Sequence, residues 1–347
     1  MGRRRGDTHR VLRWLWTSRR VDARLTRLVL LPASGLWQAG MAARRAVYRR
    51  GWLTVRDLPL PSVAIGNLTV GGSGKNAIAA WVAAHYARRG IVPGIVLAGG
   101  SSTDVRVMEH AVEGARVTTG NDVFEAAGRA AAAGAAVLVL DDAYQRLDVR
   151  SDLTIAVVSA ETTRAVGWTV PAGPWREGRP ALDRADVIII TRKRASTEAA
   201  AQLQAELQAG SARPVAIASL ALRYLEGLLS GARHPAGLLA GRRVVAATAS
   251  VDPDAFVAQT KATGAAVQVA TWRDQEDFRD EDVAWLAHAT RRADHVVITE
   301  RDAAKLRDRW PARVAEPLVA VLDLEWESGG DAVVAALAAV VTPVERL

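Results

Sequence analysis

The sequence predicts an α/β protein with a phosphate-loop NTPase-like parallel sheet, a second, smaller α/β lobe and an N-terminal membrane-associated helix. Apolar runs of strand length alternate with helical stretches along most of the chain, which is typical of parallel sheets covered by helices. A glycine-rich turn ending in Gly-Lys follows an early apolar run, and a basic, tryptophan-containing segment precedes it. We therefore expect a basic amphipathic segment at residues 1–55, a phosphate-loop nucleotide-binding lobe at 56–225 and a smaller α/β lobe at 226–347.

The composition is that of a folded protein without cysteine chemistry. Half of the 347 residues are hydrophobic and 24% are charged, which is ample material for a core and excludes a chain that is disordered throughout. The absence of cysteine excludes a disulfide scaffold, a thiolate zinc site, an iron–sulfur cluster and thiol catalysis. The six histidines are scattered, so a histidine-built metal site is not expected either.

The net charge of +8 is concentrated at the N-terminus. Residues 1–50 hold 13 arginines against Asp7 and Asp22, a local net charge of +11, so the remainder carries −3. Tryptophans lie beside these arginines, and the uncharged stretch 28–43 is shorter than the ~20 apolar residues of a membrane span. The pattern favours a helix lying in the headgroup region of an anionic membrane. The alternatives are a helix packed on the body, a cleaved signal peptide and, ranked last, a nucleic-acid arm, so we expect no nucleic-acid partner.

Ten apolar runs are predicted to be strands. Helical patterns such as residues 197–209 and 280–292 lie between many of them. Gly210-Ser211 and the stretch 227–241 interrupt the alternation, so we place the seam between the lobes near residues 210–240. The predicted strands are 62–65, 91–97, 137–140, 154–158, 187–191, 214–222, 244–249, 267–271, 295–299 and 318–322.

A phosphate-binding loop is predicted between the run 62–65 and the helical pattern that stops at Gly90. Glycines let backbone N–H groups converge on phosphate oxygens, and the lysine, here Lys75, reaches the β- and γ-phosphates. The motif departs from G-x-x-x-x-G-K-[ST] at both ends: Thr69 replaces the first glycine, and Asn76 replaces the hydroxyl residue that ligates Mg²⁺. An amide oxygen can also ligate this hard cation. The predicted nucleotide-contacting residues are Thr69, Val70, Gly71, Gly72, Ser73, Gly74, Lys75 and Asn76.

A pair of carboxylates, Asp141 and Asp142, closes the apolar run 137–140. A buried strand that delivers a carboxylate to its C-terminal end is how phosphate-loop enzymes place their second Mg²⁺-holding group. Asn76 and Asp142 are therefore the predicted metal ligands. The alternative for the pair is a polar turn after a strand, and the alternative for the loop is a tight strand–helix connection.

Several stretches follow one another in an order that carries further information. They are 30–48, 66–75 with its threonine-containing phosphate loop, Asp-Asp-Ala-Tyr-Gln at 141–145, Pro-Ala-Gly-Pro-Trp-Arg-Glu at 171–177, 252–256 and Thr-Glu-Arg-Asp-Ala-Ala-Lys at 299–305. In this order they resemble motifs of the tetraacyldisaccharide 4′-kinase (lipid A 4′-kinase) family, over roughly residues 25–325.

The resemblance implies transfer of the ATP γ-phosphate, with Mg²⁺, to the 4′-hydroxyl of a tetraacylated diglucosamine 1-phosphate, the lipid A disaccharide precursor. It also implies a protein held at the cytoplasmic face of the inner membrane without crossing it. We take Lys75 and Asp142 as catalytic, and we assign the substrate to Asp141, Gln145, Arg176 and Glu300. Arginine suits phosphate recognition, although Arg176 and Glu177 could instead form a surface ion pair. Glu300 follows a strand, where a plain helix start is equally compatible.

Three family motifs are altered in this chain. S-R-G-Y-G reads Ala-Gly-Gly-Ser-Ser at 98–102, G-D-E-P leaves only Asp104, and D-H-H-x-Y corresponds to 274–278, where Gln275 replaces a histidine. The family's proposed acid–base pair consists of that aspartate and that histidine, and glutamine cannot take a proton. We therefore predict that Asp104 or Glu276, with Asp277 as a further candidate, accepts the proton. The alternative is a weak or inactive relative that acts as a membrane-surface nucleotide-binding module.

A phosphate-loop GTPase or metallochaperone is disfavoured by the residues after the run 187–191. Guanine recognition would require N-K-x-D at a strand end. The nearest candidate, Thr-Arg-Lys-Arg at 191–194, lacks both the asparagine and the aspartate.

Overall fold

The computed structural model describes residues 14–16, 18, 20–161, 167–209, 212–250, 252–272 and 277–342. Contacts within the chain divide these residues into two compact units. The phosphate-loop unit holds the residues up to 101, 108–219 and those from 326 onward, and the second unit holds 102–107 and 220–325. Two strands, β9 (Val215–Gly227) and β14 (Leu318–Ser328), each have residues in both units.

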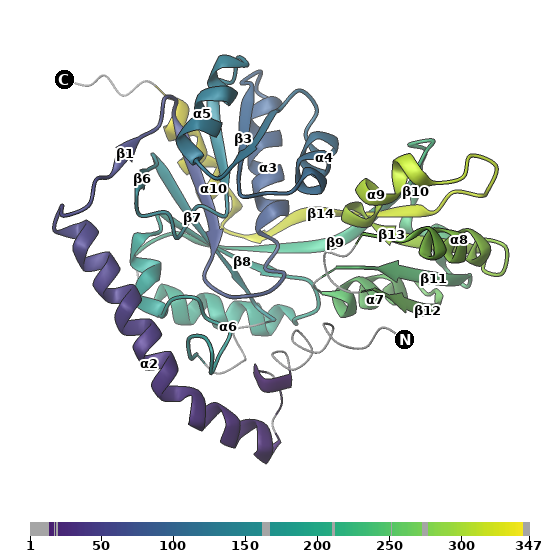
Figure 1. The fold of residues 1–347 in the computed structure, drawn as a ribbon, viewed down its shortest axis with the longest axis horizontal. Coiled ribbons are helices and arrows are strands. Elements are labelled where there is room, and N and C mark those ends of the chain that lie inside the picture. Colours follow the sequence, from purple (N-terminus) through teal and green to yellow (C-terminus); the bar gives the residue numbers. More distant parts are fainter. Residues whose placement is uncertain are drawn as a thin grey trace. The chain divides into compact units, whose positions relative to one another are not determined.

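The phosphate-loop unit is built on a parallel sheet with the strand order β9-β8-β7-β2-β5-β3-β4 (Figure 1). The first strand of this sheet along the chain, β2, lies in the middle, with β5 on one side and β7 on the other. Ligands bind at the carboxyl ends of parallel strands where the order reverses in this way, so the position of β2 directs attention to the residues after it. The strands are β2 (Ser62–Asn67), β3 (Pro93–Ala98), β4 (Arg116–Gly120), β5 (Val137–Asp141), β7 (Leu153–Ser159) and β8 (Val187–Arg192).

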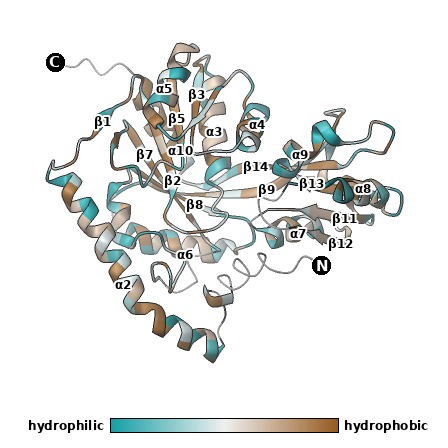
Figure 2. Cartoon of the chain, viewed as in Figure 1, coloured by the Kyte–Doolittle hydropathy of each residue, from teal (hydrophilic) through white to brown (hydrophobic). Residues whose placement is uncertain are grey.

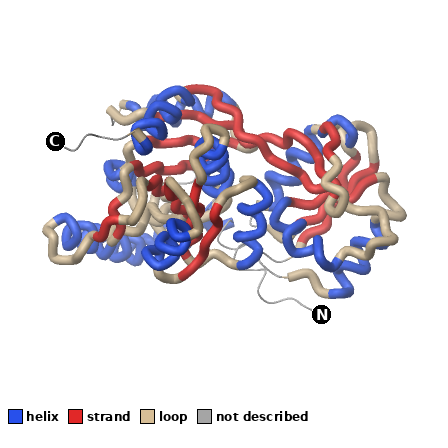
Figure 3. Tube along the Cα trace, turned by 90° about the horizontal axis from the view of Figure 1, so that it is seen from above, coloured by secondary structure: helices blue, strands red, loops and turns tan. Residues whose placement is uncertain are grey.

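Helices cover both faces of this sheet (Figure 3). On one face, α5 (Val123–Ala132) packs on Ala64 and Leu138, and α6 (Thr197–Gln208) packs on β7 and β8. Side chains alternate along a strand, so neighbours such as Val63 and Ile65 point to the other face. There, α3 (Lys75–Ala87) contacts β2, β3 and β5, and α10 (Gly330–Val341) contacts β2 and β7. The Tyr86 hydroxyl donates a 2.9 Å hydrogen bond to the carbonyl of Leu337 and thereby joins α3 to α10.

The second unit is a smaller α/β layer structure with the strand order β12-β11-β13-β14-β9. Its helix α7 (Pro253–Ala262) packs on one face through Phe256, and α8 (Asp280–Ala289) and α9 (Glu300–Leu306) pack on the other through Leu286 and Leu306. The remaining elements are α4 (Ser102–Ala111), β10 (Arg233–Pro235), which pairs antiparallel with β9, β11 (Arg243–Thr248), β12 (Ala266–Thr271), β13 (His295–Thr299), and the short pair β1 (Arg56–Asp57) and β6 (Val149–Arg150).

A single long helix, α2 (Val21–Arg49), runs from the N-terminal segment through Pro32 without a break in the assignment. Ala23, Arg27 and Ser34 on one side are buried against the unit. Apolar residues remain exposed on the opposite side, and brown and teal patches alternate along the helix in Figure 2. These exposed residues are Val21, Leu25, Leu28, Val29 and Leu36.

The predicted α/β fold with a largely parallel sheet is confirmed, and each of the ten predicted strands overlaps an observed one. The units differ from the expected ranges at both ends: residues 102–107 and 220–225 belong to the second unit, and residues 326–342 belong to the phosphate-loop unit, because α10 packs on β2 and β7. Among the described residues, no helix combines the length and apolar character needed to cross a bilayer.

Candidate nucleotide and phosphoryl-transfer site

The phosphate loop connects β2 to α3 at the carboxyl edge of the sheet. Gly71 (φ 125°) and Gly74 (φ 79°) adopt left-handed backbone angles that a side chain disfavours, and Gly74 immediately precedes the helix. The first N–H groups of α3 have no acceptor within the helix and, with its positive end, provide an anion-binding position. The local structure that the sequence predicts for residues 69–76 is therefore present.

Lys75 lies among three oxygen-bearing side chains. Its ammonium nitrogen is 3.5 Å from Asp141 Oδ1 and 3.7 Å from Asp142 Oδ2, and it donates a 3.2 Å hydrogen bond to Asn76 Oδ1. Asp142 has a positive φ of 60°. Among the described residues, it is the only one other than glycine with a positive φ. A left-handed conformation is unusual for a residue with a side chain and is typical of a functional turn.

The two aspartates have different environments. Asp141 ends the buried strand β5 and is 4% exposed, and its Oδ1 accepts no hydrogen bond. Burial raises the pKa of the Asp141 carboxyl, while the nearby Lys75 ammonium acts in the opposite direction. The Asp142 side chain is one-third exposed and receives the Arg176 guanidinium at 3.2 Å. The predicted residues Lys75, Asn76, Asp141, Asp142 and Arg176 therefore form one cluster.

The segment 168–177 lies alongside the phosphate loop. The Val70 N–H donates to the Pro174 carbonyl, and the Arg176 N–H donates to the Leu68 carbonyl, both at 2.7 Å. These two bonds frame a bridge between Thr69 and Trp175, so the segment behaves as a short strand partner of the loop. Arg176 is thereby placed beside Asp142.

Gln145 and Glu177 fix the surroundings of this cluster. The Gln145 side-chain amide donates to the Asn67 carbonyl at 2.8 Å, so Gln145 supports the end of β2. Glu177 is 1% exposed and accepts hydrogen bonds from Arg45 of α2 and from Arg184, each at 2.8 Å at its shortest. The surface ion pair considered for Arg176 and Glu177 is thus wrong, because the Glu177 carboxylate is buried between two other arginines.

Helix α2 packs directly on the segment 168–177. The Ser34 hydroxyl donates to the Thr169 carbonyl at 2.8 Å and accepts from the Ala172 N–H at 3.0 Å. The Trp37 indole N–H donates to the Arg176 carbonyl at 2.7 Å. The helix and the phosphate loop therefore both contact the same short segment through hydrogen bonds to its backbone.

Two residues that the sequence analysis did not assign also contact the phosphate loop. Thr191, at the end of β8, donates its hydroxyl to the Ser73 carbonyl at 2.6 Å, and the Lys193 ammonium donates to the Gly72 carbonyl at 2.9 Å. Their stretch was considered only as a failed guanine motif. The position of this stretch after a central parallel strand was the sequence feature that could have indicated a contact with the phosphate loop.

Three predicted site residues are not part of this cluster as described. Asp104 and Glu300 belong to the second unit, where Asp104 pairs with Arg301 at 3.1 Å. Burial and, to a lesser extent, the neighbouring Glu226 carboxylate raise the pKa of Glu300 to about 7. Glu276, together with Gln275, lies outside the described residues.

The oxygen donors around Lys75 suit Mg²⁺. Asn76 Oδ1 and the carboxylates of Asp141 and Asp142 already gather around one positive charge, and the Asp141 oxygen has no hydrogen-bond donor. Magnesium is usually held by one or two carboxylates together with the phosphates of a nucleotide. Within the described ranges, no three His, Cys, Asp or Glu side chains converge as a metal cage.

The second unit has a hollow of its own. It has a volume of about 640 Å³, lies among β11, β12 and α8, and is lined in part by Arg243, Trp285 and Arg292. None of the predicted site residues that the structure describes lines it.

Comparison with known proteins gives a consistent result. A model of the family described as Tetraacyldisaccharide-1-P 4′-kinase (LpxK) matches residues 26–111 and 101–342. The tetraacyldisaccharide 4′-kinase of Anaeromyxobacter sp. is 33% identical over 325 residues, which cover 86% of each chain. Those of Thiobacillus denitrificans and Xanthomonas oryzae pv. oryzae are 31% and 28% identical, over 81% and 85% of this chain and 87% and 88% of theirs.

The fold is similar to that of a solved protein. The crystal structure of LpxK from Aquifex aeolicus in complex with ATP superposes with a TM-score of 0.71 and 19% sequence identity. The match covers 91% of this chain and all of that one.

Proposed function

The chain belongs to the tetraacyldisaccharide-1-P 4′-kinase family and is a phosphotransferase of lipid A biosynthesis, and from this premise we propose how its own residues carry out the transfer. The proposed reaction joins the 4′-oxygen of a tetraacylated diglucosamine 1-phosphate to the γ-phosphorus of ATP. The bond from that phosphorus to the β,γ-bridging oxygen breaks, ADP leaves, and the hydroxyl proton passes to a base. The observation that carries the assignment to this site is the cluster of Lys75, Asp141 and Asp142 at the start of α3.

We propose that Lys75 and the amide groups at the start of α3 bind the triphosphate. The solved relative is a complex with ATP, and the threonine-containing loop of this chain has the glycine geometry that phosphate binding requires. Phosphoryl transfer depends chiefly on positioning and on neutralising the charge of the transferring group. The Lys75 ammonium would move from its carboxylate partners toward the phosphates as the nucleotide enters.

Asn76 and Asp142 would hold Mg²⁺, which supplies charge neutralisation at the phosphates when bound. Arg176 adds a second positive charge next to Asp142, in a place fixed by the pairing of its own backbone with Leu68. Arg176 is therefore a proposed contact of a phosphate or of the 1-phosphate disaccharide, with Asp141, Gln145 and Glu300 as the other proposed substrate-site residues. In this arrangement Asp141 acts through Lys75, and Gln145 acts through the end of β2.

Asp104 and Glu276 remain the proposed proton acceptors. The Arg301 guanidinium at 3.1 Å orients the Asp104 carboxylate within the second unit. General acid–base assistance contributes about 10²–10⁴-fold to a rate, so the replacement of histidine by Gln275 predicts a slow enzyme. The variant with Asn76→Thr and Gln275→His should therefore raise kcat about tenfold or more while the ATP affinity changes by no more than a few-fold.

The test of the nucleotide site uses two variants, one for ATP binding through the charge of Lys75 and one for ATP binding through Mg²⁺. Lys75→Ala should weaken ATP binding both with Mg²⁺ and with a chelator, and should lower kcat/KM for lipid phosphorylation by roughly 10²–10³-fold. Asp142→Asn keeps the shape and tolerates the left-handed backbone, so its effect on ATP binding should appear only with Mg²⁺. Calorimetry and a radiolabelled-phosphate assay with the tetraacyl disaccharide provide the two readouts. Unchanged ATP affinity in Lys75→Ala would remove the phosphate-loop assignment.

We further propose that α2 holds the protein on an anionic membrane surface, at the cytoplasmic face of the inner membrane where the family's lipid is phosphorylated. Support comes from the exposed residues Leu28, Val29 and Leu36, opposite the buried Ser34, together with the arginines of the segment. Replacing these three residues by serine should lower binding to phosphatidylglycerol-containing vesicles at least tenfold. Leu229→Ser with Val269→Ser, which alters exposed apolar residues of the second unit, is the control. Equal vesicle binding by the α2 variant and the control would contradict the proposal.

A further inference from the structure

The turn after β8 is built around the partly buried carboxylate of Glu161. Glu161 Oε1 accepts hydrogen bonds from the backbone N–H groups of Lys193, Arg194 and Ala195, at 2.6, 2.8 and 3.1 Å. The Ser159 hydroxyl donates to the other oxygen at 2.7 Å. Burial opposes ionisation of Glu161, but these hydrogen bonds outweigh it, and the pKa of its carboxyl is lowered. The turn is therefore held in one conformation by a charged acceptor.

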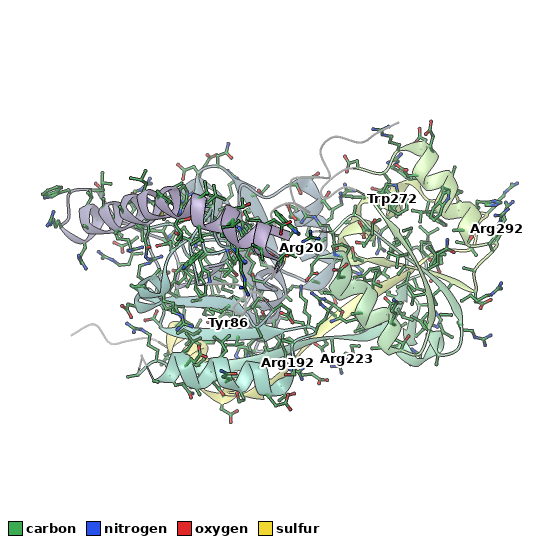
Figure 4. All side chains as sticks on the ribbon, turned by 90° about the horizontal axis from the view of Figure 1, so that it is seen from below. Arg20, Tyr86, Arg192, Arg223, Trp272 and Arg292 are labelled. Atoms are coloured by element: carbon green, nitrogen blue, oxygen red, sulfur yellow. The ribbon has the colours of Figure 1, made fainter. Side chains whose placement is uncertain are left out.

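This turn presents two donors to the phosphate loop. The Thr191 hydroxyl, on a residue that is 1% exposed, donates to the Ser73 carbonyl, and the Lys193 ammonium donates to the Gly72 carbonyl. Arg192, labelled in Figure 4, turns elsewhere and donates from Nε to Glu327 at 2.7 Å. The contacts with the loop thus come from alternate residues of β8 and its turn.

A carbonyl held on one side of a loop determines where the next amide points. In a planar trans peptide the C=O and the N–H point in opposite directions. Holding the Ser73 carbonyl toward Thr191 therefore turns the Gly74 N–H away from β8, and holding the Gly72 carbonyl limits rotation of the preceding peptide, whose Ser73 N–H bonds to the Gly71 carbonyl. Gly74 and Lys75 begin the helix that receives the phosphates.

We propose that Thr191 and Lys193 are positioning residues for nucleotide binding, which hold the carbonyl groups of Ser73 and Gly72 and thereby fix the backbone that leads into the amide groups at the start of α3, where the triphosphate binds. The proposal rests on the proposed function of the loop but assigns residues outside its motif, from a strand more than a hundred residues later in the chain. A flexible glycine-rich loop has many conformations, so fixing two of its carbonyls in the free protein reduces the ordering that ATP must otherwise supply.

The test uses shape-conserving variants of the full chain. Thr191→Val and Lys193→Met each remove one donor, and each should raise the ATP dissociation constant roughly fivefold to tenfold, the effect of one lost hydrogen bond. Because both act on one loop, the double variant should lose less than the product of the single effects. KM for ATP should rise more than kcat falls, KM for the disaccharide should not change, and Thr191→Ser should restore ATP affinity to within twofold of the parent.

Controls separate positioning from stability and from the function itself. Arg88→Met removes one exposed positive charge at the far end of α3 and should leave ATP affinity unchanged. Inorganic triphosphate is the direct probe of the loop and should follow ATP in each variant. Lys193 is partly exposed, so its replacement should not prevent folding. If Thr191→Val fails to fold, the ATP affinity of Lys193→Met therefore tests the proposal. ATP affinity in Lys193→Met equal to that of Arg88→Met overturns the proposal. A parent that binds ATP without phosphorylating the disaccharide contradicts the proposed function alone.

Discussion

At the scale of single residues, the distance between the phosphate loop and the aspartate pair depends on Gly66. A Cβ atom on Gly66 would lie 2.6 Å from the Cβ and 2.8 Å from the backbone nitrogen of Tyr144. These are contacts with backbone and with the root of a side chain, which cannot rotate away. The absence of a side chain at Gly66 therefore lets the turn after β5 approach the end of β2, and it brings Asp141 and Asp142 within reach of Lys75.

A buried carboxylate near the site should matter for stability. Glu177→Gln leaves the Arg45 and Arg184 guanidinium groups, both about one-quarter exposed, facing a neutral amide. Removing one partner of a buried ion pair costs about 3–5 kcal/mol, and the partial exposure of the arginines places the expected loss near the lower limit. Urea unfolding should show this loss. Glu206→Gln, from an exposed pair with Arg179, should cost less than ~1 kcal/mol, and an equal effect of the two variants would argue against the role of burial.

The stability of the folded chain should depend on pH through Glu300. Burial and the Glu226 carboxylate raise the pKa of Glu300 from 4.5 to about 7 in the folded state, so the folded state binds the proton more tightly than the unfolded state. The resulting stabilisation is complete below pH ~4.5 and is lost as the pH rises through 7, a change of about 3 kcal/mol at most. Urea unfolding between pH 5.5 and 8.5 should show a steeper decline for the parent than for Glu300→Gln. Parallel curves would show that Glu300 does not titrate in this range.

At the scale of elements, α2 and the segment 168–177 form one support for the phosphate loop. Ser34 on the buried side of the helix binds Thr169 and Ala172, and the far end of the segment pairs with Leu68 and Val70. Arg20, labelled in Figure 4, marks the residue just before this helix. A change on α2 should therefore be detectable at the nucleotide.

Ser34→Ala should loosen this support. It removes two hydrogen bonds and leaves the Ala172 N–H and the Thr169 carbonyl without that partner, at a cost of about 1–3 kcal/mol. We expect faster amide exchange in residues 168–177 and a few-fold higher KM for ATP. Thr26→Ala, on an exposed part of the same helix, is the matched control. Amide exchange in residues 168–177 that stays at the parental rate in Ser34→Ala would refute the coupling.

The central elements could be predicted from sequence because their signals are local. Buried strands such as β2 and β5 are continuous apolar runs, and the phosphate loop and aspartate pair are short motifs attached to them. The strand β4, Arg-Val-Thr-Thr-Gly, was missed because an edge strand buries too little to need an apolar run. The contacts of Thr191, Lys193 and Glu177 join residues more than a hundred positions apart, and no pattern within a short window records them.

At the scale of the whole molecule, the described part of the chain passes between the two units four times, at residues 101–102, 107–108, 219–220 and 325–326. The last two passages occur within the strands β9 and β14. The described part of the second unit therefore consists of two insertions in the phosphate-loop unit, residues 102–107 and 220–325, and does not form a separate C-terminal range. Its boundaries follow from where α10 packs, which depends on contacts such as that of Tyr86 with Leu337.

Isolated fragments should reveal this organisation. Residues 226–347, the smaller lobe expected from sequence, lack most of β9 and include α10 without the strands that cover its apolar side. Residues 220–325 contain the second unit apart from residues 102–107, together with its parts of the strands β9 and β14. We expect the second fragment to show more regular secondary structure by circular dichroism and a steeper urea transition, and the first to aggregate. Cooperative unfolding of the fragment 226–347 would contradict this division.

The proposed position of α2 on the membrane would also determine how far the phosphate loop lies from the lipid surface. With its exposed side chains in a bilayer, the helix would separate the lipid surface from the segment 168–177 by about its own thickness, ~10 Å, and that segment touches the phosphate loop. A lipid with four acyl chains cannot leave the membrane without losing about 0.8 kcal/mol for each buried CH₂ group. The sugar hydroxyl therefore stays in a thin layer above the surface, and the donor phosphate has to be carried at that level. If α2 lies on the membrane as proposed, it would act as the spacer, and the encounter between the two substrates would become a search within a plane.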